Sequence, residues 1–427
     1  MKILVVGGGG REHALVWKLG QSPHADKIYC APGNAGIADL AQCLPIAAED
    51  LPAICRAVDE YEIDLTVVGP EAPLAAGLAD VLEKNGKLVF GPSRLAAQLE
   101  SSKEFAKTLM KEAKIPTAAY QAFSDPDRAE AYIKAQKLPL VIKADGLAAG
   151  KGVVVAQTID EAVAAVYDML EGGAFGAAGR RVLIEEFLEG QEVSVLAFCD
   201  GKQIVPLVSS QDHKRAFDGD LGPNTGGMGA FSPAVGYTQD LARRVEQEIL
   251  APTVAMMAHW GRPYKGVLYA GLMLTEEGPK VLEYNVRFGD PETQALLLCL
   301  KTDLLEIIQA VLAGRLSEIE IIWRKEAAAC VVLAAEGYPG AYAKNRVING
   351  LAEAQALGVE IFHAGTARKK GQILTAGGRV LALAALGEDI TQAAAKAYQA
   401  AELIHFEGCF YRKDIACKAV RNEELFF

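Results

Sequence analysis

The chain has 427 residues, of which 51% are hydrophobic and 23% are charged; this composition excludes a mostly disordered protein and predicts about two to four folded domains. The net charge of −11 excludes a general nucleic-acid coat protein, because such a surface repels phosphate backbones, but it allows a locally basic pocket for a small phosphate ligand. No apolar run reaches the ~20 residues of a membrane-spanning helix, and the first residues lack the apolar stretch of a secretory signal.

Short β-rich runs alternate with helical stretches at the start of the chain, which is the pattern of a parallel sheet with crossover helices. Four of these runs end in glycine-rich turns, at Gly7–Gly10, Pro32–Gly36, Gly69–Pro73 and Gly91–Ser93. Ligands bind at the carboxyl ends of the strands in open α/β sheets, so this rim is a candidate site. We therefore predict an N-terminal, Rossmann-like substrate domain over residues 1–102.

The central part of the chain changes character from Ser101 onward. A helix is expected from there to just before Pro116, since a polar cap precedes it and a proline ends it. Strand-like runs then pair around glycine-containing turns, 140–143 with 153–156 and 182–186 with 192–198, and this spacing predicts two antiparallel hairpins. Helices near 239–258 and strands at 268–274 and 280–286 complete a central α+β domain over residues 103–325.

A third unit follows, with strands near 328–334 and 379–385 and a helix near 389–403. These elements predict a small C-terminal α+β domain over residues 326–427. The fold class is therefore α/β, with a parallel N-terminal domain followed by two α+β domains. The eight cysteines lie singly without a CxxC pair, which excludes a zinc ribbon or a disulfide scaffold and predicts buried thiols in a cytoplasmic protein.

The first glycine turn leaves a strand and opens a helix, as a dinucleotide-binding fingerprint would. Glu12 takes the place of the third glycine of that fingerprint, so the match to a dinucleotide site is weak. Free backbone N–H groups at the start of a helix bind anions, which indicates a phosphate or phosphosugar ligand. The plain alternative is a tight strand–helix turn that holds no ligand.

A second glycine-rich loop begins after Lys143 and contains Lys151. It is not a Walker A loop, because Gly152 stands where that motif has serine or threonine. A glycine loop between two strands can fold over the phosphates of a nucleotide while lysines neutralise their charge. The alternative, a flexible surface hairpin, does not explain the two lysines that bracket the loop.

Glu283, Asn285 and Arg287 alternate with apolar residues in a predicted strand, so they share one face while the residues between them point into the core. The two oxygen-bearing side chains suit Mg²⁺, and the arginine could clamp a carboxylate or a phosphoryl group with two parallel hydrogen bonds. The alternative is a solvated strand face with an ordinary ion pair.

The polar tract over residues 211–229 predicts a long loop, and long loops in compact domains are often functional. Asp212 could receive an amine, and Lys214 or Arg215 could receive a phosphate. A solvated cluster of charges is the alternative for these three residues.

Together these segments resemble the glycinamide ribonucleotide synthetases of the ATP-grasp superfamily over essentially the whole chain. The resemblance rests on GGGGREHAL, APGNAG, VVGPEAPL, VIKADGLAAGKGV, SQDHKR, GPNTGGMGA, YAGLM, NVRFGDPETQ and RKDI. It implies ATP-dependent ligation of glycine to 5-phosphoribosylamine through a glycyl phosphate, in de novo purine synthesis. It also implies that residues 1–102 are a pre-ATP-grasp domain and 103–325 the ATP-grasp domain, with a mobile subdomain at about 118–190.

The resemblance further implies a role for individual residues. Lys103 and Lys143 would contact the phosphates, and Glu192 the ribose. The full set implied to bind ATP is Lys103, Lys143, Gly146, Gly150, Lys151, Gly152, Glu185, Glu186, Phe187, Leu188 and Glu192. Glu283 and Asn285 would hold Mg²⁺ or Mn²⁺, and Arg287 and Asp212 would be catalytic. The set implied to bind glycine and phosphoribosylamine is Gly9, Gly10, Gly33, Asn34, Glu71, Lys214, Arg215, Thr225, Gly226 and Asp290.

Two positions depart from the expected pattern. The strand before Glu283 carries no acidic residue, unlike that of many ATP-grasp enzymes, so the number of metal ions stays open; Ala416 follows RKDI where glycine is expected. Three other functions are alternatives: an aminoimidazole ribonucleotide carboxylase of the same superfamily, a nucleotide-binding regulatory module without turnover, and a dinucleotide-dependent oxidoreductase. The expected partners are small-molecule substrates, with no nucleic acid or membrane, and the expected state is a monomer or weak dimer.

Overall fold

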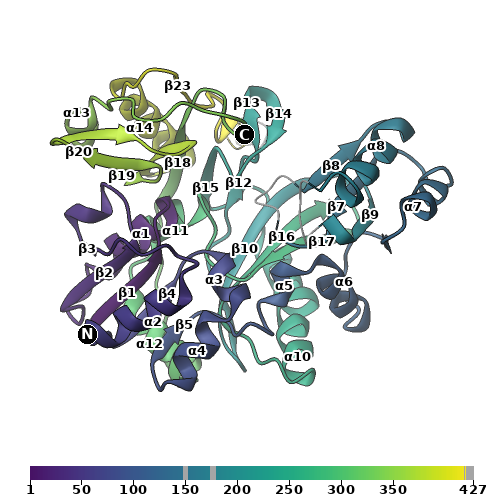
Figure 1. Cartoon of the computed structure of the whole chain (residues 1–427), viewed down its shortest axis with the longest axis horizontal. Helices are drawn as coiled ribbons and strands as arrows, with labels where there is room; N and C mark the ends of the chain where they lie inside the picture. The colour runs from purple at the N-terminus through teal and green to yellow at the C-terminus, as the bar shows by residue number, and fades with distance from the viewer. Residues whose placement is uncertain (148–151, 174–178, 418, 420–427) are drawn as a thin grey trace.

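The structure is a computed structural model and describes residues 1–147, 152–173, 179–417 and 419. In Figure 1 the N-terminal sheet and the C-terminal sheet lie one above the other, and long central strands run beside both. A lobe formed by residues 120–147, 152–173 and 179–186 projects to one side. No helix within the described ranges combines the length and the apolar character needed to cross a membrane.

The N-terminal sheet is parallel throughout, as predicted. Its strands are β1 (Lys2–Gly7), β2 (Lys27–Pro32), β3 (Gln42–Cys43), β4 (Leu65–Val68) and β5 (Leu88–Phe90). They lie in the order β3-β2-β1-β4-β5. The accompanying helices are α1 (Gly10–Leu19), η1 (Ile37–Asp39), α2 (Leu51–Glu60), α3 (Glu71–Ala76) and α4 (Leu78–Lys84). The apolar run 3–6 of β1 is fully buried, because helices cover both faces of a parallel sheet.

The projecting lobe contains an antiparallel sheet in the order β6-β9-β7-β8. Its elements are β6 (Tyr120–Phe123), α7 (Pro126–Ile133), β7 (Leu140–Ala144), β8 (Val153–Ala156), α8 (Ile159–Leu170) and β9 (Val182–Glu186). The antiparallel pairing of β7 with β8 confirms the first predicted hairpin. An apolar cluster between the sheet and α7 and α8 gives this lobe a core of its own.

The second predicted hairpin is wrong. β9 pairs with β6 and β7, whereas β10 (Gln191–Asp200) pairs with β11 (Ile204–Pro206) and β16 (Lys265–Thr275) in a separate sheet. The chain crosses between the sheets at Gly190, whose φ of +154° and close approach to the carbonyl of Leu274 leave no room for a side chain. The short segment between β9 and β10 therefore connects two different sheets and is not the turn of a hairpin.

The central sheet has the order β11-β10-β16-β17, and β17 (Gly278–Asn285) is its edge strand. Helices α5 (Gln98–Ser101) and α6 (Lys103–Glu112) contact β17. Ser102 caps α6, because its Oγ accepts a hydrogen bond from the N–H of Phe105 at 3.1 Å, as the polar cap in the sequence predicted. The remaining helical elements are α9 (Gln239–Val245), η4 (Glu246–Leu250), α10 (Ala251–His259), α11 (Glu292–Cys299), α12 (Leu304–Ala313) and η5 (Leu316–Glu318).

The long loop expected over residues 211–229 is also wrong, since the tract folds into short pieces of regular structure. These are β12 (Gln211–Asp212), β13 (Arg215–Phe217), η3 (Asp218–Asp220) and β14 (Leu221–Asn224), and β15 (Gly229–Ser232) begins at its end. β13 and β14 form a small hairpin, and β12 pairs with β15. Glycine and proline have low strand propensity, so the sequence did not indicate these strands. Pairing with neighbouring strands stabilises them in the fold.

The C-terminal sheet runs in the order β12-β15-β18-β22-β19, with β23 beside β18, so it includes strands from the central region. Its other elements are β18 (Ala327–Ala335), α13 (Leu351–Gln355), β19 (Glu360–His363), β22 (Arg379–Gly387), α14 (Ile390–Leu403) and β23 (Cys409–Phe410), with a separate hairpin of β20 (Thr366–Lys369) and β21 (Gln372–Thr375). One continuous sheet therefore joins Asp212 to the C-terminal region. The fold class predicted from the sequence is confirmed.

Ala416 occupies the position after RKDI where the family resemblance predicts glycine. Its φ is 68°, in the left-handed region where alanine is less stable than glycine by about 1–2 kcal/mol. Ala416→Gly should raise the free energy of unfolding by about 0.5–1 kcal/mol, after the greater freedom of glycine in the unfolded chain is subtracted. Denaturant unfolding measures this change. The control Ala397→Gly, inside α14, should lower the same quantity by about 1 kcal/mol, and a loss of stability in Ala416→Gly would contradict the prediction.

His13 joins the N-terminal region to the C-terminal region, because its Nδ1 accepts the N–H of His363 at 2.7 Å. Burial, together with the nearby His363, lowers the pKa of His13 to about 3. The unfolded chain therefore takes up a proton below about pH 6.5 that His13 refuses in the folded protein. This group alone should lower the free energy of unfolding by about 1.4 kcal/mol per pH unit as the pH drops from about 6 to 4. His363, whose pKa burial lowers to about 4, adds to the loss in the same window. His13→Asn keeps an acceptor but cannot be protonated. Its unfolding free energy should depend less steeply on pH in that window, and an unchanged slope would contradict this.

Candidate active site

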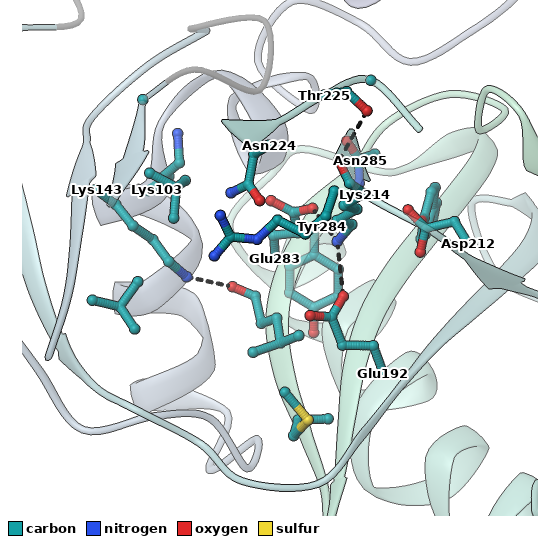
Figure 2. A pocket seen from close by; sticks show the side chains of 18 of the residues that line it. Lys103, Lys143, Glu192, Asp212, Lys214, Asn224, Thr225, Glu283, Tyr284 and Asn285 are labelled. Carbon is teal, nitrogen blue, oxygen red and sulfur yellow. Dashed lines mark hydrogen bonds and ion pairs between the residues drawn. The ribbon is translucent and has the colours of Figure 1, made fainter. Parts of the chain in front are cut away.

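A cavity of about 1390 Å³ lies where the lobe, the central sheet and the N-terminal and C-terminal regions meet. Charged residues from each part line it, among them Glu71, Lys143, Glu283 and Arg379. Figure 2 shows Lys103 and Lys143 on one side, Asp212 on the other, and Glu283 and Lys214 between them. These residues lie far apart in the sequence, so only the tertiary fold assembles the site.

β17 and the residues just after it supply one wall. Glu283, Asn285 and Arg287 line the cavity, and Tyr284, Val286 and Phe288 are buried in apolar clusters, which confirms the predicted alternation. Tyr284 also borders the cavity. Lys214 lowers the pKa of Glu283 to about 2 despite its burial, so this carboxylate stays ionised. The wall therefore presents an anionic oxygen, an amide oxygen and a guanidinium in sequence.

Arg287 is held in place by two carboxylates from the first 100 residues. Its Nε donates to Glu71 Oε2 and its Nη2 to Glu100 Oε1, both at 3.1 Å, and Nη2 also reaches Asn285 Oδ1 at 3.1 Å. Nη1 donates to the carbonyl of Phe288 at 3.2 Å. Of the five N–H groups of an arginine, these bonds leave one on Nη1 among the described contacts. The guanidinium thus offers the cavity a single donor, instead of the two-donor clamp predicted from the sequence.

Sequence reasoning missed Glu100, which no motif marks. It also accepts the N–H of Val286 at 2.7 Å, and burial raises its pKa to about 7 although Arg287 opposes the shift. A carboxyl group with this pKa would exchange its proton near neutral pH, and its charge would then change beside Arg287.

Lys143 shares the carboxylate of Glu185 with a second lysine. Lys143 Nζ lies 2.9 Å and Lys107 Nζ 3.1 Å from Glu185 Oε2. Lys107 is only 2% exposed, and burial lowers its pKa to about 8 although Glu185 opposes the shift. The sequence did contain a signal for Lys107, because it follows Lys103 by four residues and so lies on the same face of α6.

Lys103 and the segment 185–188, called the hinge below, also reach the cavity. Lys103 Nζ donates to the carbonyl of Gly146 at 2.9 Å, and Gly146 and Gly152 line the cavity on either side of the residues that the structure does not describe. Gly150 and Lys151 lie outside the described residues. The segment 185–188 lines the cavity where the chain leaves the lobe.

Lys214 lies between two of the acidic residues singled out in the sequence. Its Nζ is 3.3 Å from Glu283 Oε1 and 3.4 Å from Glu192 Oε2. Glu192 and Glu283 hold the pKa of Lys214 well above its usual value in spite of its burial. Burial raises the pKa of the neighbouring Asp212 to about 8, an effect that Lys214 opposes and Glu292 reinforces. Asp212 and Glu292 both lie at this end of the cavity, where a positively charged ligand group would lower the pKa of Asp212 and stabilise its ionised form.

Of the glycine turns of the N-terminal rim, only the 69–73 turn reaches the cavity, through Pro70 and Glu71. The N–H of Gly9 donates to Glu12 Oε2 at 2.6 Å, so this carboxylate occupies the place proposed for an anion. A Cβ at Gly7 or Gly69 would lie within 2.5 Å of the Glu12 side chain, so only glycine fits at these two positions. The tight turn without a ligand is therefore the better description of this motif.

Three further residues predicted to bind substrate lie behind the cavity wall. Asn34 Nδ2 donates to the carbonyls of Gly8 and His363, at 3.0 and 2.7 Å, and its Oδ1 accepts two backbone N–H groups. Gly10 and Gly33, like Gly9, are absent from the cavity lining. Arg215, Thr225, Gly226 and Asp290 do line it, and so do Arg379 and Tyr338, which sequence reasoning missed because the C-terminal region carried no recognisable site motif.

The fold and the cavity define a three-part ATP-grasp enzyme. Residues 1–100 match the model of the phosphoribosylglycinamide synthetase N domain, 101–293 that of the ATP-grasp (A) domain, and 328–418 that of the C domain. The chain belongs to the phosphoribosylglycinamide synthetase family, as predicted, and is a ligase of purine biosynthesis. ATP-grasp enzymes in general use ATP and divalent metal ions, and the partners of this family are small-molecule substrates.

Individual relatives support the same conclusion. The chain is 53% identical to the phosphoribosylamine–glycine ligases of Brucella melitensis and Pseudomonas aeruginosa, over 99% of each chain. The crystal structure of the phosphoribosylamine–glycine ligase of Thermotoga maritima superposes with a TM-score of 0.87 at 36% identity, covering 97% of this chain and all of that one. An N5-carboxyaminoimidazole ribonucleotide synthetase of Thermus thermophilus shares only the fold, at 19% identity and a TM-score of 0.64. The comparisons therefore favour the ligase over the carboxylase alternative.

Proposed function

We propose that this cavity ligates glycine to 5-phosphoribosylamine at the expense of ATP. The carboxylate of glycine takes the γ-phosphoryl group and releases ADP, and the amine of phosphoribosylamine then attacks the acyl phosphate, releasing phosphate and a proton and forming N1-(5-phosphoribosyl)glycinamide. The observation that carries the proposal is one cavity in which Glu283, Asn285 and Arg287 lie together with Lys143 and Asp212. Phosphoryl transfer depends mainly on positioning and on charge neutralisation, which these groups provide.

The lobe and the hinge bind the nucleotide in this proposal. Lys103 and Lys143 contact its phosphates together with the loop that carries Gly146, Gly150, Lys151 and Gly152, of which Gly150 and Lys151 stay predictions. The base lies against Glu185, Glu186, Phe187 and Leu188. Glu185 Oε1 is buried without a hydrogen-bond donor among the described residues, so it is available to a donor on the base. Glu192 accepts from the ribose hydroxyl groups.

Glu283 and Asn285 hold the divalent ion, Mg²⁺ or Mn²⁺. Their chemistry fits, because an ionised carboxylate and an amide oxygen share one face and hard cations prefer oxygen ligands. Within the described residues no group of three or more His, Cys, Asp or Glu side chains could hold a metal alone, so substrate oxygens and water must complete the coordination. When bound, the ion would neutralise phosphate charge.

The other end of the cavity binds the two remaining substrates. Asp212 receives the ammonium of glycine beside Thr225 and Gly226, and Arg287 directs its free N–H at the carboxylate that becomes phosphorylated. Phosphoribosylamine contacts Glu71, Lys214, Arg215 and Asp290. The residues Gly9, Gly10, Gly33 and Asn34 shape the wall behind these contacts.

We also propose that the chain divides functionally at the predicted boundaries, 1–102, 103–325 and 326–427, and that the subdomain at about 118–190 moves as a lid over the nucleotide. The separate core of the lobe supports such a movement. We propose finally that the protein is a monomer or weak dimer in the cytoplasm.

Release of ADP tests this function directly. With ATP, Mg²⁺ and freshly generated phosphoribosylamine, ADP should be released only when glycine is also supplied, because the acyl phosphate cannot form without it. A coupled assay for ADP measures the rate, and bicarbonate with aminoimidazole ribonucleotide replaces the two substrates in a parallel reaction. Release that is indifferent to glycine, or that follows the bicarbonate reaction, would overturn the proposal.

A further inference from the structure

Arg379, at the start of β22, reaches from the C-terminal sheet to two loops of the cavity wall. Its Nη1 donates to the carbonyls of Gly226 and Gly227, at 2.8 and 3.3 Å, and to the carbonyl of Asp290 at 2.7 Å. Its Nη2 lies 3.2 Å from Asp290 Oδ2. One guanidinium therefore joins the 225–227 turn to the segment that follows Arg287.

The 225–227 turn has little conformational freedom. The N–H and the Oγ1 of Thr225 both donate to the carbonyl of Lys214, at 2.7 and 2.9 Å, and the N–H of Gly227 donates to that Oγ1 at 2.9 Å. The N–H of Gly226 donates to the Oη of Tyr338 at 3.1 Å. The C-terminal region thus binds three backbone groups of the turn, through Tyr338 and Arg379.

The two glycines of this turn are explained by the same contacts. A Cβ at Gly226 would lie 3.0 Å from Arg379 Cζ, so a side chain there would press on the guanidinium. Gly227 has a φ of +113°, and a Cβ there would lie 2.4 Å from Pro291. The two glycines of GPNTGG are therefore needed because Arg379 and the 290–291 segment pack against them. The sequence alone did not reveal this reason.

The position of Asp290 ties this arrangement to the transfer site. Asp290 lies three residues after Arg287, and its side chain also accepts from Gln294 at 2.8 Å. The separation between the turn and Arg287 is consequently set by a side chain from outside the ATP-grasp region. Positioning of this kind matters because displacement of a substrate by about 1 Å can cost about a hundredfold in rate.

We infer that Arg379 is a positioning residue for glycine: it holds the 225–227 turn at a fixed distance from Arg287, so that the C-terminal region completes the glycine end of the active site. This inference rests on the proposed binding of glycine by Asp212, Thr225 and Gly226. It assigns Arg379 no contact with the reacting atoms.

The test compares the kinetics of Arg379→Met, Arg379→Lys and Tyr338→Phe. Arg379→Met should raise the KM for glycine about tenfold or more and lower kcat less, while the KM for ATP stays within about twofold. Arg379→Lys should recover part of the loss, because one ammonium can reach a carbonyl but cannot join both loops. Tyr338→Phe should change the glycine KM in the same direction by a smaller factor.

Arg368 supplies the matched control, because it also ties the C-terminal region to the N-terminal region, through Asp39 at 2.5 Å, but does not line the cavity. Arg368→Met should leave both KM values unchanged. An equal rise in the KM for ATP and for glycine in Arg379→Met, or a glycine KM equal to that of Arg368→Met, would overturn the inference. If Arg379→Met does not fold, Arg379→Lys decides the same question: a selective rise in glycine KM supports the inference and an unchanged KM refutes it.

Asp212→Asn separates this inference from the proposed function. A glycine KM that rises in Asp212→Asn but not in the Arg379 variants would leave the glycine site standing and refute the positioning role. A glycine KM unchanged in Asp212→Asn would refute the placement of glycine itself, whatever the Arg379 variants show.

Discussion

Arg287→Ala should lower kcat by about a thousandfold while the affinity for ATP stays within about twofold, because the guanidinium neutralises charge that develops during phosphoryl transfer. In the proposed site the nucleotide is bound by residues of the lobe and by the segment 185–188, Lys143 among them, which Arg287 does not contact in the described structure. Single-turnover kinetics and equilibrium binding of a nucleotide analogue measure the two quantities separately. Normal turnover in this variant would show that the transfer site is elsewhere.

Stability must be followed alongside, because Arg287 is also structural. Its removal leaves the partly buried Glu71 and Glu100 without their cation, which should lower the free energy of unfolding by less than the loss of about 3–5 kcal/mol expected for a fully buried pair. The double variant Arg287→Ala with Glu100→Gln should recover part of that stability, since the neutral amide tolerates burial. It should recover none of the lost kcat, and this difference separates the two roles of the arginine.

Glu283→Gln should raise the Mg²⁺ concentration required for half-maximal rate by about 10- to 100-fold, because an amide oxygen binds a hard cation more weakly than an ionised carboxylate. The low pKa of Glu283 indicates that the wild-type carboxylate is charged at neutral pH. Titration of Mn²⁺ in the presence of a nucleotide analogue, followed by electron paramagnetic resonance, provides a measurement independent of turnover.

Glu277→Gln is the matched control, because Glu277 lies in the turn that joins β16 to β17 but outside the cavity, in an ion pair with Lys280. It should leave the metal requirement unchanged. If Glu283→Gln and Glu277→Gln bound Mn²⁺ equally well, Glu283 would be rejected as a metal ligand.

Local patterns in the sequence predicted the elements whose signals are local. The pairing of β7 with β8, the cap of α6 and the alternation along β17 were all predicted, since each depends on neighbours along the chain. The parallel N-terminal sheet was predicted from the regular alternation of short strands with helices, although its strands pair across long stretches of sequence. The wall formed by Glu283, Asn285 and Arg287 followed from strand periodicity alone.

Features that depend on tertiary contacts could not be predicted in the same way. The chain crosses between two sheets after β9, and nothing near Gly190 in the sequence distinguishes this crossing from a hairpin turn. The Glu12 side chain accepts the N–H of Gly9 and packs against Gly69. A motif typical of phosphate binding therefore has its N–H group bound by a side chain of the protein. Glu100 and Arg379 carry no motif, and only their contacts across the fold bring them to the cavity.

The proposed mechanism requires that Glu283, Asn285 and Arg287 face the nucleotide phosphates during phosphoryl transfer. A crystal structure with Mg²⁺ and a non-hydrolysable ATP analogue tests this most directly. The account predicts that the ion lies between the nucleotide phosphates and the side-chain oxygens of Glu283 and Asn285, with Arg287 beside the terminal phosphate. A triphosphate bound away from these three side chains would contradict it.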